Sequence, residues 1–405
     1  MVIAILAFVL TPLAALAQPP LEEAPSPEET TPEAPPFGTD VDVADPGPEE
    51  AISEPEPEPT LPPAAPESPD TPEPPPAPNP LHLSGYVQPE LRFGPRVDPS
   101  PYFHLRRGRI KIDYTVDYGE LLVQIDATQD GVSLKNAWGA LDPPMPEGMA
   151  LRVLFGLFEI PFGFDIEYSS SRRLFPERSM LARNMFPGER DLGLEVVASF
   201  ADELLSVQLA LQNGTPLGDP FRSDLPHPDG NGFKDLTARV GFDADPVHVG
   251  VSGLYGRGFR PEQFDDPLTP ANESMPAFDF VRWAGGIDAR FEQELPILGA
   301  LDVYGELAYG RNMLRRTVAQ YPVDDGARTD ALTWYVAATQ HLGDYFAVGA
   351  RLDQLDPEGA GNTSTRITVL GAAFPISSTQ VVLAYDIDPD DGGNNEGWLR
   401  LQAKF

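Results

Sequence analysis

The sequence predicts an all-β fold, a transmembrane antiparallel β-barrel of about 16 strands. From residue 81 onward, segments of 9 to 16 residues alternate apolar and polar side chains, as strands with one apolar face do. A tilted strand needs about 9 to 11 residues to cross a bilayer, roughly twice the usual length in soluble proteins. After residue 17, no run of 18 or more apolar residues could form a membrane helix. Strands in lipid must close into a barrel, because an open edge would leave backbone groups unpaired.

The first segment of the chain has the pattern of an export signal. Residues 1–17 form an apolar run that ends in Ala15-Leu16-Ala17, the small-x-small pattern of a signal-peptidase site. The run is too short and too early to be a convincing membrane span. No Lys or Arg precedes it, which a truncated or misassigned start would explain. We therefore expect a signal peptide over 1–17.

Residues 18–80 differ sharply in composition from the rest of the chain. They hold 22 Pro and 16 acidic residues and no Lys or Arg, which leaves 46 acidic against 28 basic residues, a net charge of −18, for 81–405. Pro removes backbone donors, like charges repel, and almost nothing apolar is present to bury. We expect a disordered, semi-extended periplasmic linker over 18–80, acting as a passive tether or contacting the cell wall or a partner.

The remaining residues divide into strands and links. We expect strands near 82–93, 102–117, 119–129, 131–141, 150–159, 191–200, 203–213, 234–243, 246–257, 278–292, 299–311, 329–341, 344–354, 363–374, 378–388 and 396–405. Many odd-numbered links are long, at 160–190, 214–233, 258–277 and 312–328, whereas even-numbered links are mostly tight, such as Tyr118 alone. Long loops at one end and short turns at the other are typical of outer-membrane barrels, which close with an even number of strands.

The last strand carries a more specific signal. Residues 397–405 read GWLRLQAKF, in which apolar side chains alternate with Arg400, Gln402 and Lys404 up to the terminal Phe405. Outer-membrane barrels commonly end in this way, so Phe405 resembles the assembly signal that the barrel-assembly machinery reads. Aromatic residues near strand ends are expected to form girdles at the membrane interfaces; they are Tyr102, Phe158, Trp283, Tyr304, Trp334 and Trp398.

The link at 160–190 is the most unusual stretch of the chain. A connection of about 30 residues is rare in a compact domain and is usually functional or disordered. This one holds two Phe-Pro pairs, an aromatic PFGF turn and a possible helical turn after Pro176. We expect it to fold into the mouth of the barrel and narrow the channel.

Three stretches resemble a known family, the phosphate-selective porins O and P. Residues 105–110 (LRRGRI) look like that family's early RRxR strand, and 155–163 (FGLFEIPFG) resemble its GxFxxPFG segment. Residues 175–193, with FPERSM and PGERDLG, are similar to the stretch that follows it. With the last strand, the likeness spans most of 81–405. It implies a sixteen-stranded trimeric porin of the outer membrane that passes small anions such as phosphate, with a loop in the lumen and arginines along the path.

Charged side chains at inward positions are the candidates for the pore. Guanidinium groups stay charged and fit phosphate or carboxylate oxygens. Strand parity and the long link give nine cationic candidates: Arg107, Arg109, Lys111, Arg152, Arg172, Arg173, Arg178, Arg183 and Arg190. The same link holds the acidic candidates Asp165, Glu167, Glu177 and Glu189. These charges either face one another across the channel, which would admit polar solutes of either sign, or pair to hold the loop against the wall.

Other functions find little support in the sequence. The absence of Cys excludes disulfides and thiolate sites, and the five His show no ligand spacing, so we expect no metal and no cofactor. The acidic balance does not resemble a nucleic-acid footprint, and no nucleophile motif suggests an enzyme. Two hypotheses remain: a passive channel for small hydrophilic solutes, or a structural barrel that tethers the envelope through its acidic Pro-rich arm.

Overall fold

The computed structural model describes residues 80–405 except 130, 220–228, 261–276, 315–328 and 359–362. The predicted signal peptide, and all of the predicted linker except its last residue, lie outside the described residues. Among the residues that are described, no helix is long and apolar enough to cross a membrane.

Sixteen antiparallel strands form one closed barrel, which confirms the predicted fold class. The strands are β1 (Leu81–Phe93), β2 (Tyr102–Val116), β3 (Gly119–Thr128), β4 (Gly131–Leu141), β5 (Met149–Glu159), β6 (Arg190–Phe200), β7 (Leu205–Gln212), β8 (Asp235–Ala244), β9 (Val247–Arg260), β10 (Phe278–Leu295), β11 (Gly299–Arg311), β12 (Asp330–Leu342), β13 (Phe346–Glu358), β14 (Ser364–Ile376), β15 (Thr379–Ile387) and β16 (Glu396–Lys404). Every predicted strand is present, with ends displaced by a few residues at most.

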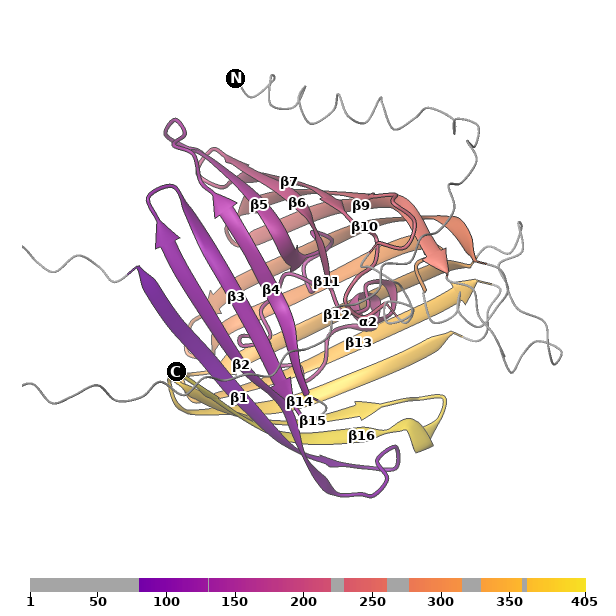
Figure 1. Ribbon diagram of the computed structural model, residues 1–405. Helices are drawn as coiled ribbons and strands as arrows, with labels where there is room; N and C mark the ends of the chain where they lie inside the picture. The colour runs from indigo at the N-terminus through magenta and orange to yellow at the C-terminus, as the bar shows by residue number, and fades with distance from the viewer. Residues whose placement is uncertain (1–79, 130, 220–228, 261–276, 315–328, 359–362) are drawn as a thin grey trace, which may run out of the picture. The chain divides into compact units, whose positions relative to one another are not determined.

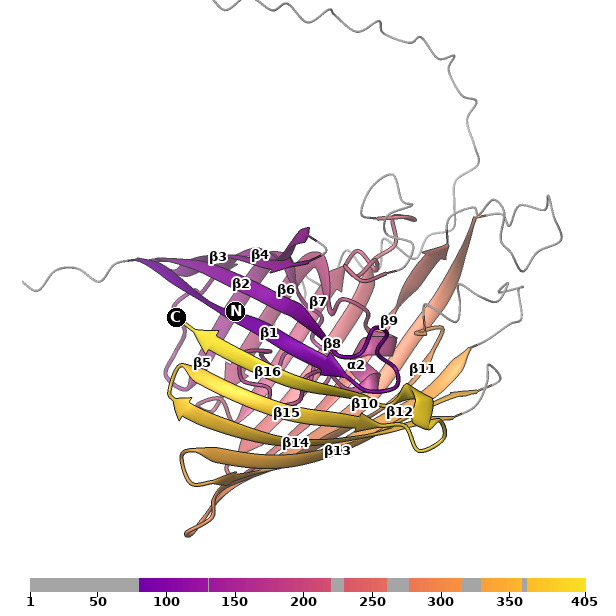
Figure 2. The same ribbon diagram turned by 90° about the horizontal axis from the view of Figure 1, so that it is seen from below.

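Neighbouring strands in the sequence are neighbours in the barrel, and β1 pairs with β16 to close it (Figures 1 and 2). Beyond the ladder, the backbone amide of Gly85 donates to the carbonyl of Phe405 at 3.1 Å, and the amide of Phe405 donates back at 3.0 Å. The links alternate between a short-turn end, which includes the C-terminus, and a long-loop end.

The two faces of the sheet differ as the alternation predicts. On β2, Ile110 and Ile112 are exposed on the outer face, whereas Arg109 and Asp113 are buried on the inner face. The predicted aromatic girdle is wrong for Phe158, Tyr304 and Trp398. These side chains are buried, because their positions in the strands share the parity of the inner face.

Three register shifts interrupt the described strands, between β1 and β2, between β3 and β4, and between β14 and β15. Opposite Pro89, which has no amide hydrogen to donate, the β1–β2 register shifts, so that Gln88 pairs with Arg107 and Pro89 with Leu105. Arg106 is the extra residue, and its side chain reaches the lumen beside that of Arg107. A second shift between β3 and β4 leaves Lys135 unpaired beside Asn136.

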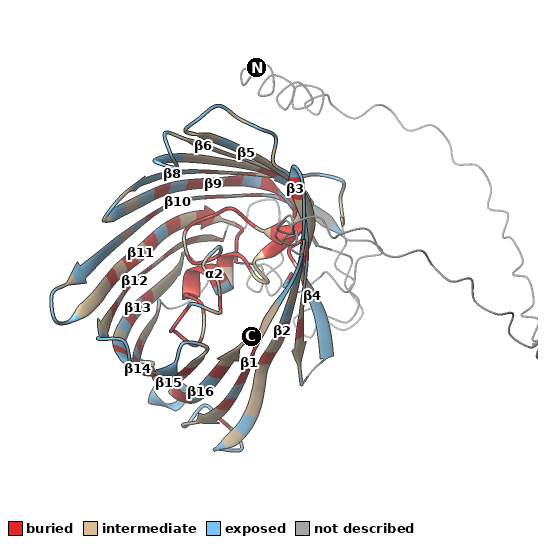
Figure 3. Ribbon diagram, turned by 90° about the vertical axis from the view of Figure 1, so that its left-hand side faces the viewer, coloured by how far each residue is buried: buried red, intermediate tan, exposed pale blue. Residues whose placement is uncertain are grey.

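Residues 160–189, named here the inner loop, fold inside the barrel (Figure 3). The loop contains the short helix α2 (Met180–Met185), which Ser179 caps by accepting a hydrogen bond from the amide of Ala182. Apolar side chains of the loop, including Phe162 and Phe186 with ring centroids 4.6 Å apart, form a buried cluster against β9–β16. The inner loop therefore has its own core in the lumen, as a shaped constriction requires.

Candidate functional site

The inner loop is fixed to the β8–β11 wall by a buried carboxylate. Oε1 of Glu306 on β11 accepts from the amide of Phe164 at 2.8 Å, from the amide of Asp165, and from the hydroxyl of Tyr335 at 2.8 Å. Gly163 has a positive φ of 67°, and a Cβ there would lie 2.2 Å from Oε2 of Glu306. Only glycine fits this close approach, which explains the glycine of the PFG turn.

Arg239 and Ser252 add two bonds to the same turn. Arg239 on β8 donates to the carbonyl of Gly163 at 3.1 Å, and the amide of Gly163 donates to the hydroxyl of Ser252 on β9 at 3.0 Å. Both backbone groups of Gly163 are therefore satisfied by the wall. A buried loop needs such partners, since an unpaired backbone group in a dry environment is costly.

The far side of the loop is fixed to β13 and β16. The first helical amide, that of Met180, donates to Asp353 at 2.8 Å, and Arg351 donates to the carbonyl of Glu177 at 2.9 Å. Arg400 on β16 donates to the carbonyl of Pro176 at 2.9 Å. Cations of the wall therefore satisfy loop carbonyls, in addition to pairing with acids.

The β1–β2 wall completes the attachment. Arg106 binds Glu177 through two parallel bonds of 2.9 Å each, the bidentate geometry that suits guanidinium and carboxylate. Ser170 accepts from Arg109 at 3.0 Å and shares a 2.7 Å hydrogen bond with the hydroxyl of Tyr86. The inner loop thus bonds to strands on all sides of the barrel.

The loop also carries an internal charge network. Arg178 contacts Glu189 at 2.6 Å and lies 3.8 Å from Asp165, and Arg173 lies 3.7 Å from Asp165. Burial alone would raise the pKa of Glu189, but the charges of Arg178 and Arg190 outweigh it and hold the pKa at about 2. Burial lowers the pKa of Arg173 to about 9, and the like charge of Arg178 adds to that effect. Glu189 and Arg173 are therefore both charged at neutral pH.

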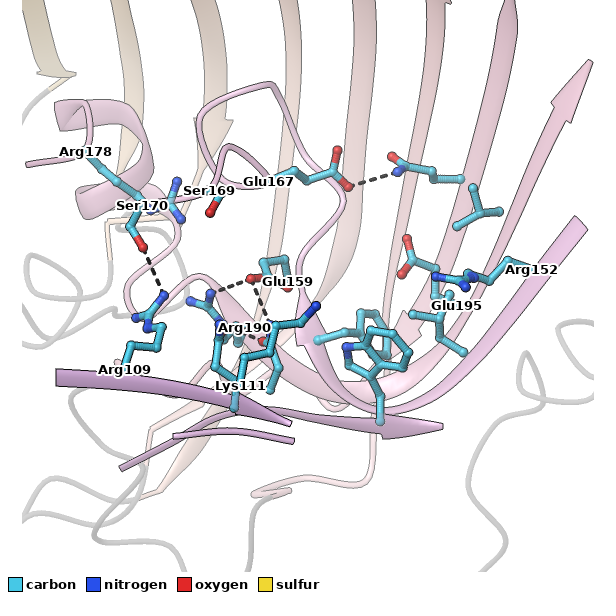
Figure 4. A pocket seen from close by; sticks show the side chains of 17 residues that line it. Arg109, Lys111, Arg152, Glu159, Glu167, Ser169, Ser170, Arg178, Arg190 and Glu195 are labelled. Carbon is cyan, nitrogen blue, oxygen red and sulfur yellow. Dashed lines mark hydrogen bonds and ion pairs between the residues drawn. The ribbon is translucent and has the colours of Figure 1, made fainter. Parts of the chain in front are cut away.

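Beside the loop lies an open space, the β2–β7 cavity, of ≈ 360 Å³ (Figure 4). Its charged lining residues are Arg109, Lys111, Arg152, Arg178 and Arg190, with Glu159, Glu167 and Glu195. Figure 4 places Arg109, Lys111 and Arg190 on one side, with Glu167 on the loop above them and Glu195 with Arg152 on the other side. The cavity is therefore polar and bordered by both signs of charge.

Most of the cations around this cavity are already paired. Arg109 binds Asp126 at 2.8 Å, Lys111 binds Asp113 at 2.6 Å, Arg152 binds Asp142 at 2.7 Å, and Arg190 binds Glu159. Glu195, by contrast, has no ion pair with any described residue, and Glu167 accepts only from Gln208, at 2.9 Å. The cations are therefore balanced by acidic partners, and the cavity has no dense cationic patch.

The predicted site residues fall into three groups. Those that line the β2–β7 cavity are Arg109, Lys111, Arg152, Arg178, Arg190 and Glu167. Those that hold the loop together or against the wall are Arg173, Asp165, Glu177 and Glu189. Arg107 belongs to none of the groups: it is buried on the inner face, and its Nε has no hydrogen-bond partner among the described residues. Arg172 and Arg183 are exposed and have no ion pair within the described part of the chain.

Sequence reasoning missed several residues that fix the loop. Arg239, Arg351 and Arg400 lie at inward positions of later strands, so strand parity applied to every strand would have found them. Arg106, which binds Glu177 of the loop, lies at a bulge, which the alternation does not reveal. No group of three or more His, Asp or Glu among the described residues is arranged to hold a metal ion.

Comparison with solved structures finds the same barrel fold in other outer-membrane proteins. The chain is similar to OmpT, an outer membrane protein of Vibrio cholerae solved in a trimer form, with a TM-score of 0.55 and 13% identity over 80% of this chain and 99% of that one. The chain has the porin fold. An anion-selective porin from Comamonas acidovorans aligns with a TM-score of 0.54 and 11% identity over 80% and 99% of the two chains. OmpF of Salmonella typhi, in complex with daunomycin, gives 0.54 and 13% over 80% and 97%.

Identities this low establish the fold alone. No family model matches the chain, and a search of curated proteins gives no match. In this barrel the inner loop is the third link at the long-loop end, following the links after β1 and β3. The position of the inner loop in the lumen and the charged cavity beside the loop are the basis of the proposed function.

Proposed function

We propose that this protein is an outer-membrane porin that allows passive diffusion of small hydrophilic solutes, among them small anions such as phosphate. One observation carries the proposal: a closed barrel holds a folded loop in its lumen, and a polar cavity remains between that loop and the wall. A pore selects by its width and by the charge at its narrowest part, where low-dielectric walls strengthen the field.

The charges beside the loop support a channel for polar solutes. Arg109 and Lys111 on β2 face Glu167 and Glu195 across the β2–β7 cavity. A field across the path orients dipolar solutes and disfavours apolar ones, because only a solute that can replace water in this field enters without a penalty. Arginines along the path support passage of small anions, whereas the two carboxylates limit the preference for them.

The location, assembly and chain organisation belong to the same proposal. The outer face of the barrel is apolar, as in Val87, Ile112 and Leu399, so it suits contact with lipid. A bacterial outer membrane is the membrane in which such barrels occur, and residues 18–80 would then lie in the periplasm after removal of 1–17. A homotrimer is supported by the family resemblance and by the trimer form of one structural neighbour.

Liposome swelling tests this function. Vesicles that contain the refolded protein should swell in isotonic arabinose and more slowly in larger sugars, and the reversal potential in a potassium phosphate gradient reports the passage of the anion. Vesicles with heat-denatured protein serve as the control. If swelling never exceeds that of the control, the channel proposal fails.

The structural barrel remains a second candidate because the inner loop is so firmly fixed. It bonds to strands β1, β2, β7, β8, β9, β11, β13 and β16. A loop held this firmly could close the lumen, which would leave the acidic Pro-rich arm as the functional part. Absence of swelling, together with co-purification of cell-wall material that depends on residues 18–80, would favour this candidate.

A further inference from the structure

A second space, the β10–β16 cavity of ≈ 290 Å³, lies on the short-turn side of the inner loop. Its wall residues, such as Glu292, His341 and Lys404, are close to the turns at that end, and the loop contributes Tyr168, Arg172 and Leu174. A cavity of this size is near the lower limit for small-molecule sites, so it suits a ligand with a single ring.

Two cations of this cavity have no counter-ion. Neither Arg172 nor Lys404 forms an ion pair with any described residue, and the two are close enough for their charges to repel each other. The third cation, Arg290, is paired with Asp302 at 2.8 Å and with Glu292 at 2.9 Å. The unbalanced positive charge therefore lies at Arg172 and Lys404, where an anion would relieve the repulsion.

A buried amide adds an unused donor. Gln380 lines the same cavity and is only 5% exposed, and its Nε2 has no hydrogen-bond partner among the described residues. Buried donors in native proteins are nearly always paired, so this amide would gain a partner if its side chain turned toward a ligand acceptor in the cavity. Ser377 and Thr379 also line this cavity.

Aromatic rings form much of the remaining lining. Tyr168 lies against Phe164 with ring centroids 4.9 Å apart, and His341 is stacked on Phe374 at 5.5 Å and 17°. The guanidinium carbon of Arg172 lies 5.8 Å from the centre of the Tyr168 ring. A planar ring between such faces gains stacking contacts that an aliphatic group of equal size does not.

We propose that the β10–β16 cavity is a binding site for a small aromatic carboxylate. The carboxylate would lie between Arg172 and Lys404 with Gln380 as a further donor, and the ring would stack among the aromatic side chains. A role for this cavity in permeation rests on the proposed channel function. Its role as a binding site is tested separately, because binding is measured without conduction.

The experiment is isothermal titration calorimetry of the detergent-purified full-length barrel with benzoate, cyclohexanecarboxylate and inorganic phosphate. Benzoate should bind about threefold more tightly than cyclohexanecarboxylate, because only the aromatic ring stacks. Arg172→Gln and Lys404→Gln should each weaken benzoate binding by about tenfold, and Arg172→Lys should weaken it less. Tyr168→Leu should abolish the preference for benzoate.

The matched control is Arg96→Gln, which removes one arginine from an exposed loop at the other end of the barrel. Heat-modifiable migration on a gel confirms that each variant is folded. No binding of benzoate to the folded wild type, equal weakening by Arg96→Gln, or phosphate binding as tight as that of benzoate would each overturn the proposal. Swelling without benzoate binding would reject this site alone, and benzoate binding without swelling would reject the channel alone.

Discussion

Glu306 should control whether the inner loop stays attached to the β11 wall. Its Oε1 is the acceptor for three buried donors, the amides of Phe164 and Asp165 and the hydroxyl of Tyr335. Replacing it with methionine keeps the length of the side chain but leaves all three donors without an acceptor. Each such donor costs about 1–3 kcal/mol, so after relaxation we expect a loss of about 4 kcal/mol. That loss raises the ratio of detached to attached loop by roughly a thousandfold.

The matched control is Glu306→Gln. Oε2 of Glu306 has no partner among the described residues, so in the Gln variant the carbonyl oxygen keeps the three bonds and only the new amide nitrogen is left unpaired, a smaller loss than in the Met variant. Single-channel recordings should show frequent conductance fluctuations for Glu306→Met and steady currents, as in the wild type, for Glu306→Gln. The reasoning is refuted if both variants fluctuate alike, or if Glu306→Met is as steady as the wild type.

Three further predictions concern charge, pH and assembly. Measured at pH 9, Glu167→Gln with Glu195→Gln should shift the reversal potential in a tenfold KCl gradient toward chloride by roughly 10 mV, since two carboxylates leave the β2–β7 cavity; a shift toward potassium would contradict the proposed field. Because the pKa of Glu189 is held at about 2, below its usual 4.5, the stabilisation it gives the loop is complete above pH 4.5 and lost as the pH falls through 2. Current noise should therefore stay constant from pH 7 to about 5 and rise below that, and noise that rises already near pH 6 would exclude Glu189 as the cause. Phe405→Ala should lower the amount of barrel inserted in cells by about tenfold while the melting temperature of the refolded protein changes little; unchanged insertion would reject Phe405 as the assembly signal.

The barrel could be predicted because its signal is periodic. A strand in contact with lipid must alternate, so Ile110 and Ile112 mark the outer face of β2 and place Arg109 and Lys111 on the inner face. The same parity places Arg152 beside the β2–β7 cavity. Where a bulge interrupts the period, as at Arg106, the alternation on that strand gives no warning. The signal lies on the neighbouring strand, where Pro89 has no amide hydrogen to donate and the register shifts.

The sequence predicted where the inner loop lies, but not which of its charged side chains are exposed to the lumen and which are buried. Arg172 and Arg173 are adjacent in sequence, yet the first is exposed to the lumen and the second is buried beside Asp165. Irregular backbone has no period, so only its tertiary packing decides which side chain turns inward. The same packing explains Tyr304, which is not part of an interfacial girdle because it lies under the loop, 5.3 Å from the ring of Phe164.

Single-channel conductance in planar bilayers tests the central claim most directly. A barrel with a polar path beside the inner loop should give discrete, ohmic current steps in symmetrical KCl that persist at low voltage. Absence of any step at every voltage, from protein that migrates as a folded barrel, would contradict the channel and leave a closed structural barrel.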